Sequence, residues 1–392
     1  MSDTSSWAGP ARTHRLNGAA PRCRCILRCP VLIDCDIHVT YSSIKELVPF
    51  ADPHTSELIE RSGVAGLSMP SYPWVHPSGW IRRDTYDADA VEAGTMFPGF
   101  GLEQLREHVL DPFDVAFALA NPDEAACFSV LPNPRLAAGL ASAYNDWLVE
   151  TWLRHEPRLR GALVVAAQWP EAAAAEIRRH GADGRFASVF LPGAARIPYG
   201  NPVYDPIWEA AAEVGLPVAV HVHYEGVGTS GPLTGAGMPD FYTEFHTLNG
   251  ASLQGHLVSI LCHGVFERHP GVKLILMEGG LVGYVSVLWR LDQNWRATRS
   301  EIPWCRRRPS DYVWDHVRFS TQPLESPDDP QQLAAALAPL HPERTLMYAT
   351  DYPHWDFDDP DQTLRTLPEA WREPIRFRTA AELFGVPVPA PA

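Results

Sequence analysis

Acidic and imidazole side chains stand at or near the ends of four short apolar runs spread along most of the chain. Asp36 and His38 lie on the first run and His221 on a middle one, while Glu278 and Asp351 follow two later runs. Carboxylate oxygens and imidazole nitrogens are ligands for Zn2+, Mn2+ and Fe2+. In a parallel β/α barrel the carboxyl ends of the strands converge, so side chains at those ends meet. The pattern therefore predicts a metal centre at one end of a barrel.

Two pairs that contain His have the spacing of a strand. Asp36 and His38 are two residues apart, as are His221 and His223, and alternate residues of a strand share one face. Each pair can direct two donors at one ion, although an Asp–His hydrogen bond is the alternative for the first pair. We expect His221, which directly follows the buried run PVAV, to be a ligand. We expect His223 either to face a substrate or to form a hydrogen bond behind the ligands.

The two later carboxylates have more than one role open to them. Asp351 follows the run MYAT, where a carboxylate can bind a metal, accept a proton from metal-bound water, or do both. Glu278 follows KLILM and precedes two glycines. A carboxylate at the end of a buried strand must be paired, metal-bound or protonated. We therefore expect Glu278 either at or directly behind the metal or in a structural role.

Eight apolar runs of strand length can position these side chains. They cover residues 31–39, 114–119, 161–167, 186–191, 216–223, 273–278, 317–321 and 345–350. Helical periodicity fills most of the intervening segments, as in residues 133–156, where Asn133 and Pro134 suit a helix start. Strands that alternate with helices predict an α/β fold, here a (β/α)8 TIM barrel. No linker-like segment divides residues 31–392, so we expect one domain.

Two segments fall outside this alternation. Residues 1–30 are polar and contain many Gly, Pro and Arg residues, and we expect a disordered or loosely attached extension. Residues from about 40 to 112 form a long insertion after the first strand, which we expect to be irregular. This insertion contains Tyr72, Trp74, His76 and Trp80. An aromatic insertion at this end of a barrel predicts either a lid over the site or a surface excursion packed on the side of the barrel.

The composition restricts the classes of partner. The formal net charge of -15 argues against unassisted binding to nucleic acid or anionic membranes. No apolar run reaches the roughly 20 residues that span a bilayer. Cys23, Cys25 and Cys29 have a spacing that suggests a metal clip, but they lack the second pair of a zinc ribbon. We expect reduced thiols in a cytoplasmic protein that acts on a small molecule and forms a homo-oligomer such as a dimer.

Six motifs carry a family resemblance. They are IDCDIH, NPRLAAGLASAYNDWL, LPVAVH, GVFERHPGVKLILMEGG, WRLDQNW and ATDYPHWDFDDP. In these motifs the chain resembles the amidohydrolase superfamily, in the amidohydrolase-related branch that includes aminocarboxymuconate-semialdehyde decarboxylase. The resemblance covers nearly everything from residue 32 onward and implies a TIM barrel with one divalent metal. The implied ligands are Asp36, His38, His221 and Asp351.

This chain departs from the family pattern at two positions. Asp36 stands where the commonest form of the strand-one pair has His, and Glu278 stands where many members have a His that acts as ligand or acid/base. A set of two carboxylates and one or two imidazoles favours Zn2+, with Mn2+ or Fe2+ as alternatives.

Three functions fit such a site. The first, which we favour, is a metal-dependent hydrolase that cleaves an amide, ester or lactone-like bond of a small aromatic or apolar substrate, with Asp351 taking the proton of metal-bound water. The second is a non-oxidative decarboxylase of an aromatic or unsaturated acid, in which His223 or His354 protonates the carbon that loses carbon dioxide. The third is a barrel that binds a ligand without turning it over. The candidate catalytic residues are Asp351, His223, Glu278 and His354.

Overall fold

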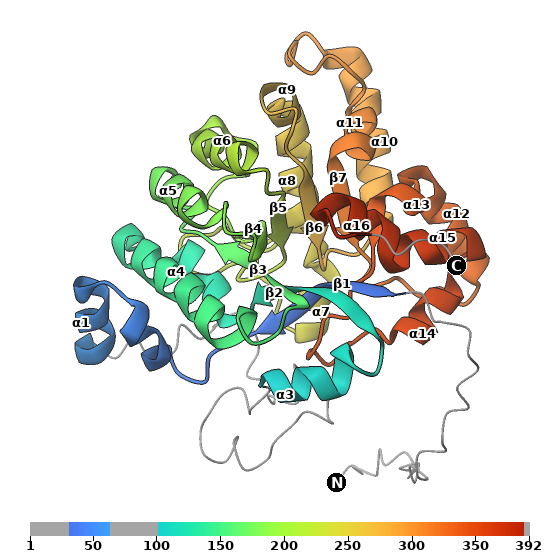
Figure 1. The fold of residues 1–392 in the computed structure, drawn as a ribbon. Coiled ribbons are helices and arrows are strands. Elements are labelled where there is room, and N and C mark those ends of the chain that lie inside the picture. Colours follow the sequence, from blue (N-terminus) through green and yellow to red (C-terminus); the bar gives the residue numbers. More distant parts are fainter. Residues whose placement is uncertain (1–30, 63–100, 388–392) are drawn as a thin grey trace, which may run out of the picture.

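The computed structural model describes residues 31–62 and 101–387, and its centre is a sheet of eight parallel strands (Figure 1). Each strand hydrogen-bonds to the next one along the chain, from β1 to β8. The strands are β1 (Leu32–Val39), β2 (Val115–Pro122), β3 (Leu159–Val164), β4 (Phe186–Pro192), β5 (Val218–His221), β6 (Leu274–Met277), β7 (Val317–Ser320) and β8 (Leu346–Met347). Nearly all their residues are buried, as expected for parallel strands covered on both faces. The predicted (β/α)8 barrel is confirmed.

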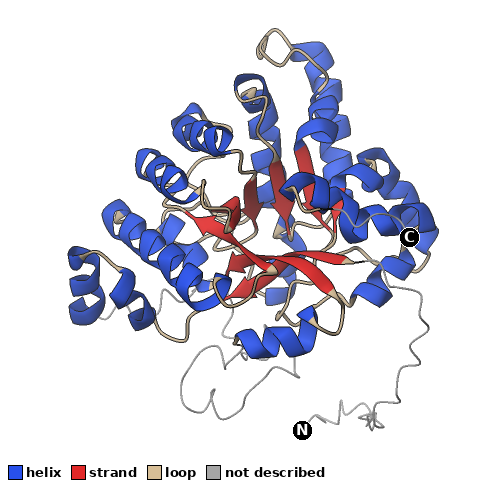
Figure 2. Cartoon of the chain, viewed as in Figure 1, coloured by secondary structure: helices blue, strands red, loops and turns tan. Residues whose placement is uncertain are grey.

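Helices surround the sheet on its outer side (Figure 2). They are α1 (Pro53–Ser62), α3 (Leu102–Leu105), α4 (Pro134–Leu148), α5 (Pro170–His180), α6 (Asp205–Val214), α7 (Tyr242–Leu248), α8 (Gly250–Cys262), α9 (Val265–Arg268), α10 (Val282–Thr298), α11 (Pro309–His316), α12 (Pro330–Leu337), α13 (Pro342–Thr345), α14 (Pro360–Thr363), α15 (Glu369–Glu373) and α16 (Thr379–Phe384). None of the helices in the described part of the chain is long and apolar enough to cross a membrane.

Local sequence sets the ends of these helices. The side chain of Asn133 accepts hydrogen bonds from the N–H groups of Arg135 and Leu136, and Pro134 occupies the first turn of α4. Helix α6 ends at Gly215, whose φ of 75 lies in the left-handed region that glycine adopts without strain. The helix start predicted at Asn133 is therefore confirmed.

The barrel closes between its last and first strands through separate backbone bonds. Among the described residues no regular ladder joins β8 to β1. Instead, the N–H of Asp351 donates to the carbonyl of Asp36 at 2.9 Å, and the N–H of His38 donates to the carbonyl of Tyr352 at 2.7 Å. This seam therefore runs directly through the residues that the sequence marks as metal ligands.

Several element boundaries differ from the prediction. Strand β5 ends at His221 rather than at residue 223, and β8 ends at Met347 rather than at residue 350. In both cases the chain leaves the ladder and soon adopts left-handed backbone, at Tyr224 and at Asp351. The helical region expected over residues 241–269 is divided into α7, α8 and α9, and Gly264, with a φ of 66, separates the last two.

The ends of the predicted insertion are helical, so the expectation of irregular structure is wrong there. A 3-10 helix (Ile44–Phe50) and α1 follow β1, and α3 with a π-helical turn (Arg106–Leu110) precedes β2. A capping box between Ser43 and Glu46 starts the first of these helices. The aromatic residues Tyr72, Trp74, His76 and Trp80 lie outside the described residues, as do residues 1–30. The lid, the extension and the domain limits therefore stay predictions.

Candidate metal centre

The carboxyl ends of β1, β5 and β8 bring four of the predicted site residues together. Asp36 and His38 belong to β1, His221 ends β5, and Asp351 follows β8. All four side chains are buried. His38 Nε2 lies 3.0 Å from Asp351 Oδ1 and 3.3 Å from Asp36 Oδ1. His221 Nε2 lies 3.0 Å from Asp36 Oδ2. Their closeness is therefore confirmed, while their role as ligands stays a prediction.

His354, on the turn after β8, joins the same cluster. Its Nδ1 lies 2.7 Å from Asp351 Oδ1, and its ring centroid lies 4.3 Å from that of His38. Two sets of three potential ligand atoms result, and within each set the atoms lie within 4.8 Å of one another. The sets are Asp36, His38 and His221, and His38, Asp351 and His354. His38 is common to both sets and connects them, whereas Asp36 and Asp351 fall in different sets.

A hydrogen bond on the far side of His221 fixes which nitrogen faces the cluster. Nδ1 lies 2.9 Å from the carbonyl oxygen of Val222 and donates a hydrogen bond to it, so Nε2 is the nitrogen that faces Asp36. A lone pair and a carboxylate at this separation repel unless a proton or a cation lies between them. Burial disfavours the protonated ring, but the Asp36 carboxylate outweighs burial and raises the pKa of His221 to about 9. This pair of donors therefore fits a metal ion.

The remaining atoms of the cluster also fit a bound cation. Three buried atoms have no hydrogen-bond partner among the described residues. They are both ring nitrogens of His38 and Asp351 Oδ2. Buried polar atoms without partners are costly. Burial and the nearby carboxylates of Asp356 and Asp36 raise the pKa of Asp351 well above its ordinary value. A divalent cation would relieve this repulsion and use the unpaired atoms.

Glu278 lies directly behind His221. Its Oε2 is 3.5 Å from His221 Nδ1, on the side opposite to Asp36. Burial and the Asp351 carboxylate raise the pKa of Glu278 well above its ordinary value. Glu278 and Asp351 both have a φ of 60, a conformation that costs a residue other than glycine about 1–3 kcal/mol and gathers at functional sites. Of the two predicted positions for Glu278, the one beside the candidate ligands agrees with these contacts.

Strand β2 and the residue that directly follows it contribute two polar side chains that the sequence did not predict. Asn121 Nδ2 donates to Asp36 Oδ1 at 2.8 Å, and Asp123 Oδ1 lies 3.4 Å from His223 Nε2. Burial opposes ionisation of Asp123, but the interaction with His223 outweighs it and lowers the pKa of Asp123 to about 2. His223 Nδ1 has no hydrogen-bond partner among the described residues, so it is available to a substrate. The available signal was the triplet Asn-Pro-Asp directly after the second apolar run.

Side chains of α7 and of the turn after β8 join across the carboxyl end of the barrel. Trp355 Nε1 donates to the hydroxyl of Tyr242 at 2.8 Å, and His246 Nε2 lies 3.1 Å from Asp356 Oδ2. The rings of Tyr242 and His246 are stacked, with centroids 5.6 Å apart. We call these four residues the α7 bridge. It places three aromatic rings close to the turn that carries His354.

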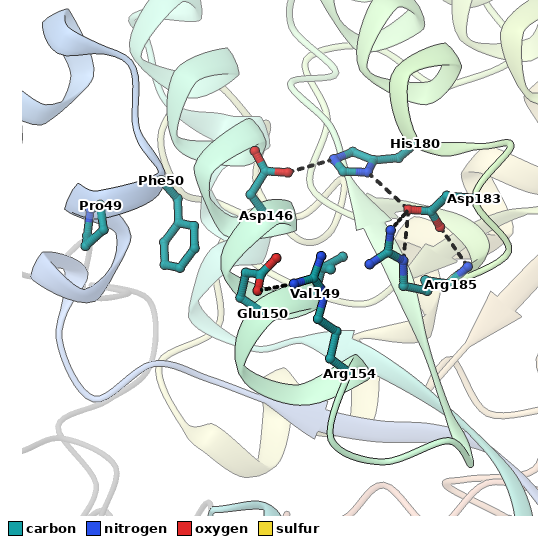
Figure 3. Close-up of a pocket in the computed structure, with 9 residues that line it drawn as sticks. All are labelled: Pro49, Phe50, Asp146, Val149, Glu150, Arg154, His180, Asp183 and Arg185. Carbon is teal, nitrogen blue, oxygen red and sulfur yellow. Dashed lines mark hydrogen bonds and ion pairs between the residues drawn. The ribbon is translucent and has the colours of Figure 1, made fainter.

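Two cavities differ in their relation to the cluster. One, of about 650 Å³ (Figure 3), lies beside Arg185, directly before β4 begins. The cluster instead lies where strands end. Its charges pair internally, Arg154 with Glu150 at 2.7 Å and Arg185 with Asp183 at 3.0 Å. The other, of about 460 Å³, is bordered by α7 and by residues that follow β6 and β7. Only the second cavity therefore belongs to the same end of the barrel as the candidate site.

Comparison with known proteins connects this geometry to a family. The family model described as amidohydrolase matches residues 33–386. The gamma-resorcylate decarboxylase of Rhodococcus jostii (strain RHA1) is 25% identical over 326 residues, which cover 75% of this chain and 93% of that protein. The gamma-resorcylate decarboxylase of Polaromonas sp. (strain JS666 / ATCC BAA-500) is 23% identical over 304 residues, which cover 72% of this chain and 87% of that protein.

Solved structures support the fold. The 5-carboxyvanillate decarboxylase LigW from Sphingomonas paucimobilis has a TM-score of 0.63 at 21% identity, over 92% of this chain and 100% of that chain. The 5-carboxyvanillate decarboxylase of Novosphingobium aromaticivorans DSM 12444 has a TM-score of 0.63 at 19% identity, over 91% of this chain and 96% of that chain. The second of these structures contains manganese.

The relatives contradict the expectation of a hydrolase. They are named decarboxylases, so the favoured reading of amide, ester or lactone hydrolysis is wrong, and the second hypothesis agrees better with them. The physical reason is that a cation held by carboxylates and imidazoles can either activate water or bind a substrate carboxylate, so ligand types alone do not distinguish the reactions. Zinc gains no support, because the metal named with similar structures is manganese. The dimer stays a prediction.

Proposed function

We propose that this chain, which belongs to the amidohydrolase family, is a metal-dependent, non-oxidative decarboxylase of a small aromatic carboxylic acid. The observation that carries the proposal is the convergence of Asp36, His38, His221 and Asp351 in one buried cluster. Support comes from the gamma-resorcylate decarboxylase of Rhodococcus jostii, 93% of whose length aligns with this chain.

Asp36, His38, His221 and Asp351 would hold one divalent metal, and we propose Mn2+ on the precedent of two similar structures. When bound, the metal would hold the substrate carboxylate and a hydroxyl oxygen next to it, and would stabilise negative charge on them. Carboxylate and imidazole donors are a set that Mn2+ accepts. The two carboxylates also balance the charge of a divalent ion.

The surrounding residues would supply a proton and orient the ring. In the reaction, the ring carbon that bears the carboxylate gains a proton, its bond to the carboxylate carbon breaks with the electron pair left on the ring, and carbon dioxide leaves. We assign proton delivery to His354, which touches Asp351 at 2.7 Å and whose side chain is 16% exposed, so that it can exchange protons with solvent. His223 and Glu278, on other sides of the cluster, would hold polar substituents of the substrate.

The substrate we propose is a benzoic acid with a hydroxyl group next to its carboxylate. That arrangement gives the metal two oxygens, and it occurs in 2,6-dihydroxybenzoate, the ligand of one similar structure. The α7 bridge offers Tyr242, His246 and Trp355, and aromatic faces pack well against a substrate ring.

The test is turnover by the full chain loaded with Mn2+, using 2,6-dihydroxybenzoate and 5-carboxyvanillate. Carbon dioxide and the decarboxylated phenol should appear in equal amounts, and in heavy water each product molecule should carry one deuterium at the carbon that lost the carboxylate. His354→Gln should lower kcat about 10²- to 10⁴-fold. The control His180→Gln changes a buried His that lines the cavity of Figure 3 and should leave kcat unchanged. Protein with one Mn2+ per chain that releases no carbon dioxide from any hydroxybenzoate would contradict the proposal.

A further inference from the structure

Asp34 lies on β1, two residues before Asp36, and has no part in the proposed reaction. Its carboxylate is fully buried and accepts three hydrogen bonds. The donors are the N–H of Asp36 at 3.2 Å, the N–H of Thr350 at 3.0 Å and the hydroxyl of Thr350 at 2.6 Å. Thr350 directly precedes Asp351 in the chain. Each of these bonds therefore ends on a proposed ligand or on the neighbour of one.

The Thr350 hydroxyl extends this restraint to the turn at Asp351. It donates to Asp34 Oδ2 and accepts a hydrogen bond from the N–H of Tyr352 at 3.2 Å. Thr350 precedes Asp351 and Tyr352 follows it, so these bonds hold the chain directly before and directly after Asp351. The φ of 60 at Asp351 is a strained conformation that persists only where the surroundings impose it. The bonds of Thr350 are part of those surroundings.

The place of these bonds in the barrel gives them a second effect. Asp36 and Asp351 lie on opposite sides of the seam between β1 and β8, where single backbone bonds replace a regular ladder. One of those bonds, from the N–H of Asp351 to the carbonyl of Asp36, joins the two residues directly at 2.9 Å. The Asp34 carboxylate on β1 accepts two hydrogen bonds from Thr350, which follows β8. These bonds help to hold the two strands together where the regular ladder is missing.

We propose that Asp34 and Thr350 are positioning residues, which form a clamp that holds the backbone at Asp36 and at Asp351 in place before a divalent cation binds. This inference rests on the proposed metal-dependent function. A site whose ligands are already in position binds its metal more tightly, because binding then costs less conformational entropy of the ligand side chains. A purely structural role would instead lower the stability of the barrel and leave metal affinity unchanged.

The experiment compares two threonines that β8 separates. Thr345 is fully buried like Thr350, and its hydroxyl donates to the carbonyl of Leu340 at 2.8 Å, but it lies at the start of β8, away from the cluster. Mn2+ affinity is measured by calorimetric titration of the metal-stripped full chain, and stability by thermal unfolding without metal. Thr350→Val should weaken Mn2+ binding about 10- to 100-fold. Thr350→Ser keeps the hydroxyl and should restore affinity, whereas Thr345→Val should lower the melting temperature and leave affinity unchanged.

Each outcome decides between the clamp and its alternatives. Equal Mn2+ affinity in Thr350→Val and Thr345→Val would overturn the clamp and leave the proposed function standing. If Thr350→Val does not fold, Asp34→Asn takes its place. The amide nitrogen of Asn cannot accept a hydrogen bond from the Thr350 hydroxyl, so unchanged Mn2+ affinity in Asp34→Asn would overturn the clamp. Wild-type protein that binds neither Mn2+ nor Zn2+ would overturn the proposed function and the clamp together.

Discussion

Replacing Asn121 with Leu should weaken metal binding about 10- to 100-fold while the barrel stays folded. Asn121 is fully buried on β2, and its Nδ2 donates to Asp36 Oδ1 at 2.8 Å. A hydrogen bond to a charged group contributes about 1.5–3 kcal/mol, and about 1.4 kcal/mol corresponds to a factor of ten in an equilibrium constant. Asn121 Oδ1 has no partner among the described residues, so an apolar side chain of similar shape removes only one further contact, the longer 3.4 Å bond from Nδ2 to the carbonyl of Cys35.

The assay is titration of metal-stripped protein with Mn2+, with free Mn2+ followed by electron paramagnetic resonance. The matched control is Asn145→Leu. Asn145 is also fully buried, and its Nδ2 also donates to a carboxylate, Glu176 Oε1 at 2.8 Å, but it lies on α4 outside the cluster. The control should lose stability and keep its Mn2+ affinity. If Asn121→Leu binds Mn2+ as tightly as wild type, the inference that Asn121 orients a ligand is refuted.

Stripping the metal with a chelator should abolish decarboxylation and added Mn2+ should restore it, whereas activity that survives complete removal would show that the cluster needs no metal. Glu278→Gln replaces the carboxyl group 3.5 Å from His221 Nδ1 with an amide, which cannot ionise when a cation binds, and should loosen Mn2+ about tenfold in the same titration; unchanged binding would make Glu278 structural. Hydrogen bonds from Arg158, and then from Arg106, outweigh burial and lower the pKa of Glu156 from 4.5 to about 2. Because the folded-state pKa is the lower one, this stabilisation is complete above about pH 4.5 and is lost as the pH falls toward 2. In urea unfolding over that range, wild type should lose about 2 kcal/mol more stability than Glu156→Gln, after solvent screening.

The strands could be predicted because burial on both faces makes each a continuous apolar run. Residues 186–191 were expected as a strand, and β4 covers Phe186–Pro192. The early ends of β5 and β8 could not be predicted, because they depend on where left-handed backbone at Tyr224 and Asp351 turns the chain out of the ladder. That conformation is imposed by tertiary bonds rather than by local residue preference.

The site was predictable where it consists of ligand-type side chains at strand ends, as for His38 and His221. Asn121 and Asp123 were missed because the predicted strand ends at residue 119, whereas β2 includes Asn121 and ends at Pro122, directly before Asp123. The reaction was misjudged for a different reason. Hydrolysis and decarboxylation use the same kinds of ligand, and the residues that distinguish them act on a substrate whose identity the chain does not record.

The α7 bridge connects the proposed substrate position to the proposed metal site, so binding at one would be coupled to binding at the other. It joins α7 to Trp355 and Asp356, which lie on the same turn as Asp351 and His354. In the proposed function, a substrate ring packed against Tyr242 would restrain that turn, and a cation at Asp351 would restrain it from the other end. Because such coupling is reciprocal, each event must raise the affinity for the other by the same factor. Under the proposed function, the metal affinity measured without substrate would then be lower than the metal affinity measured with substrate bound.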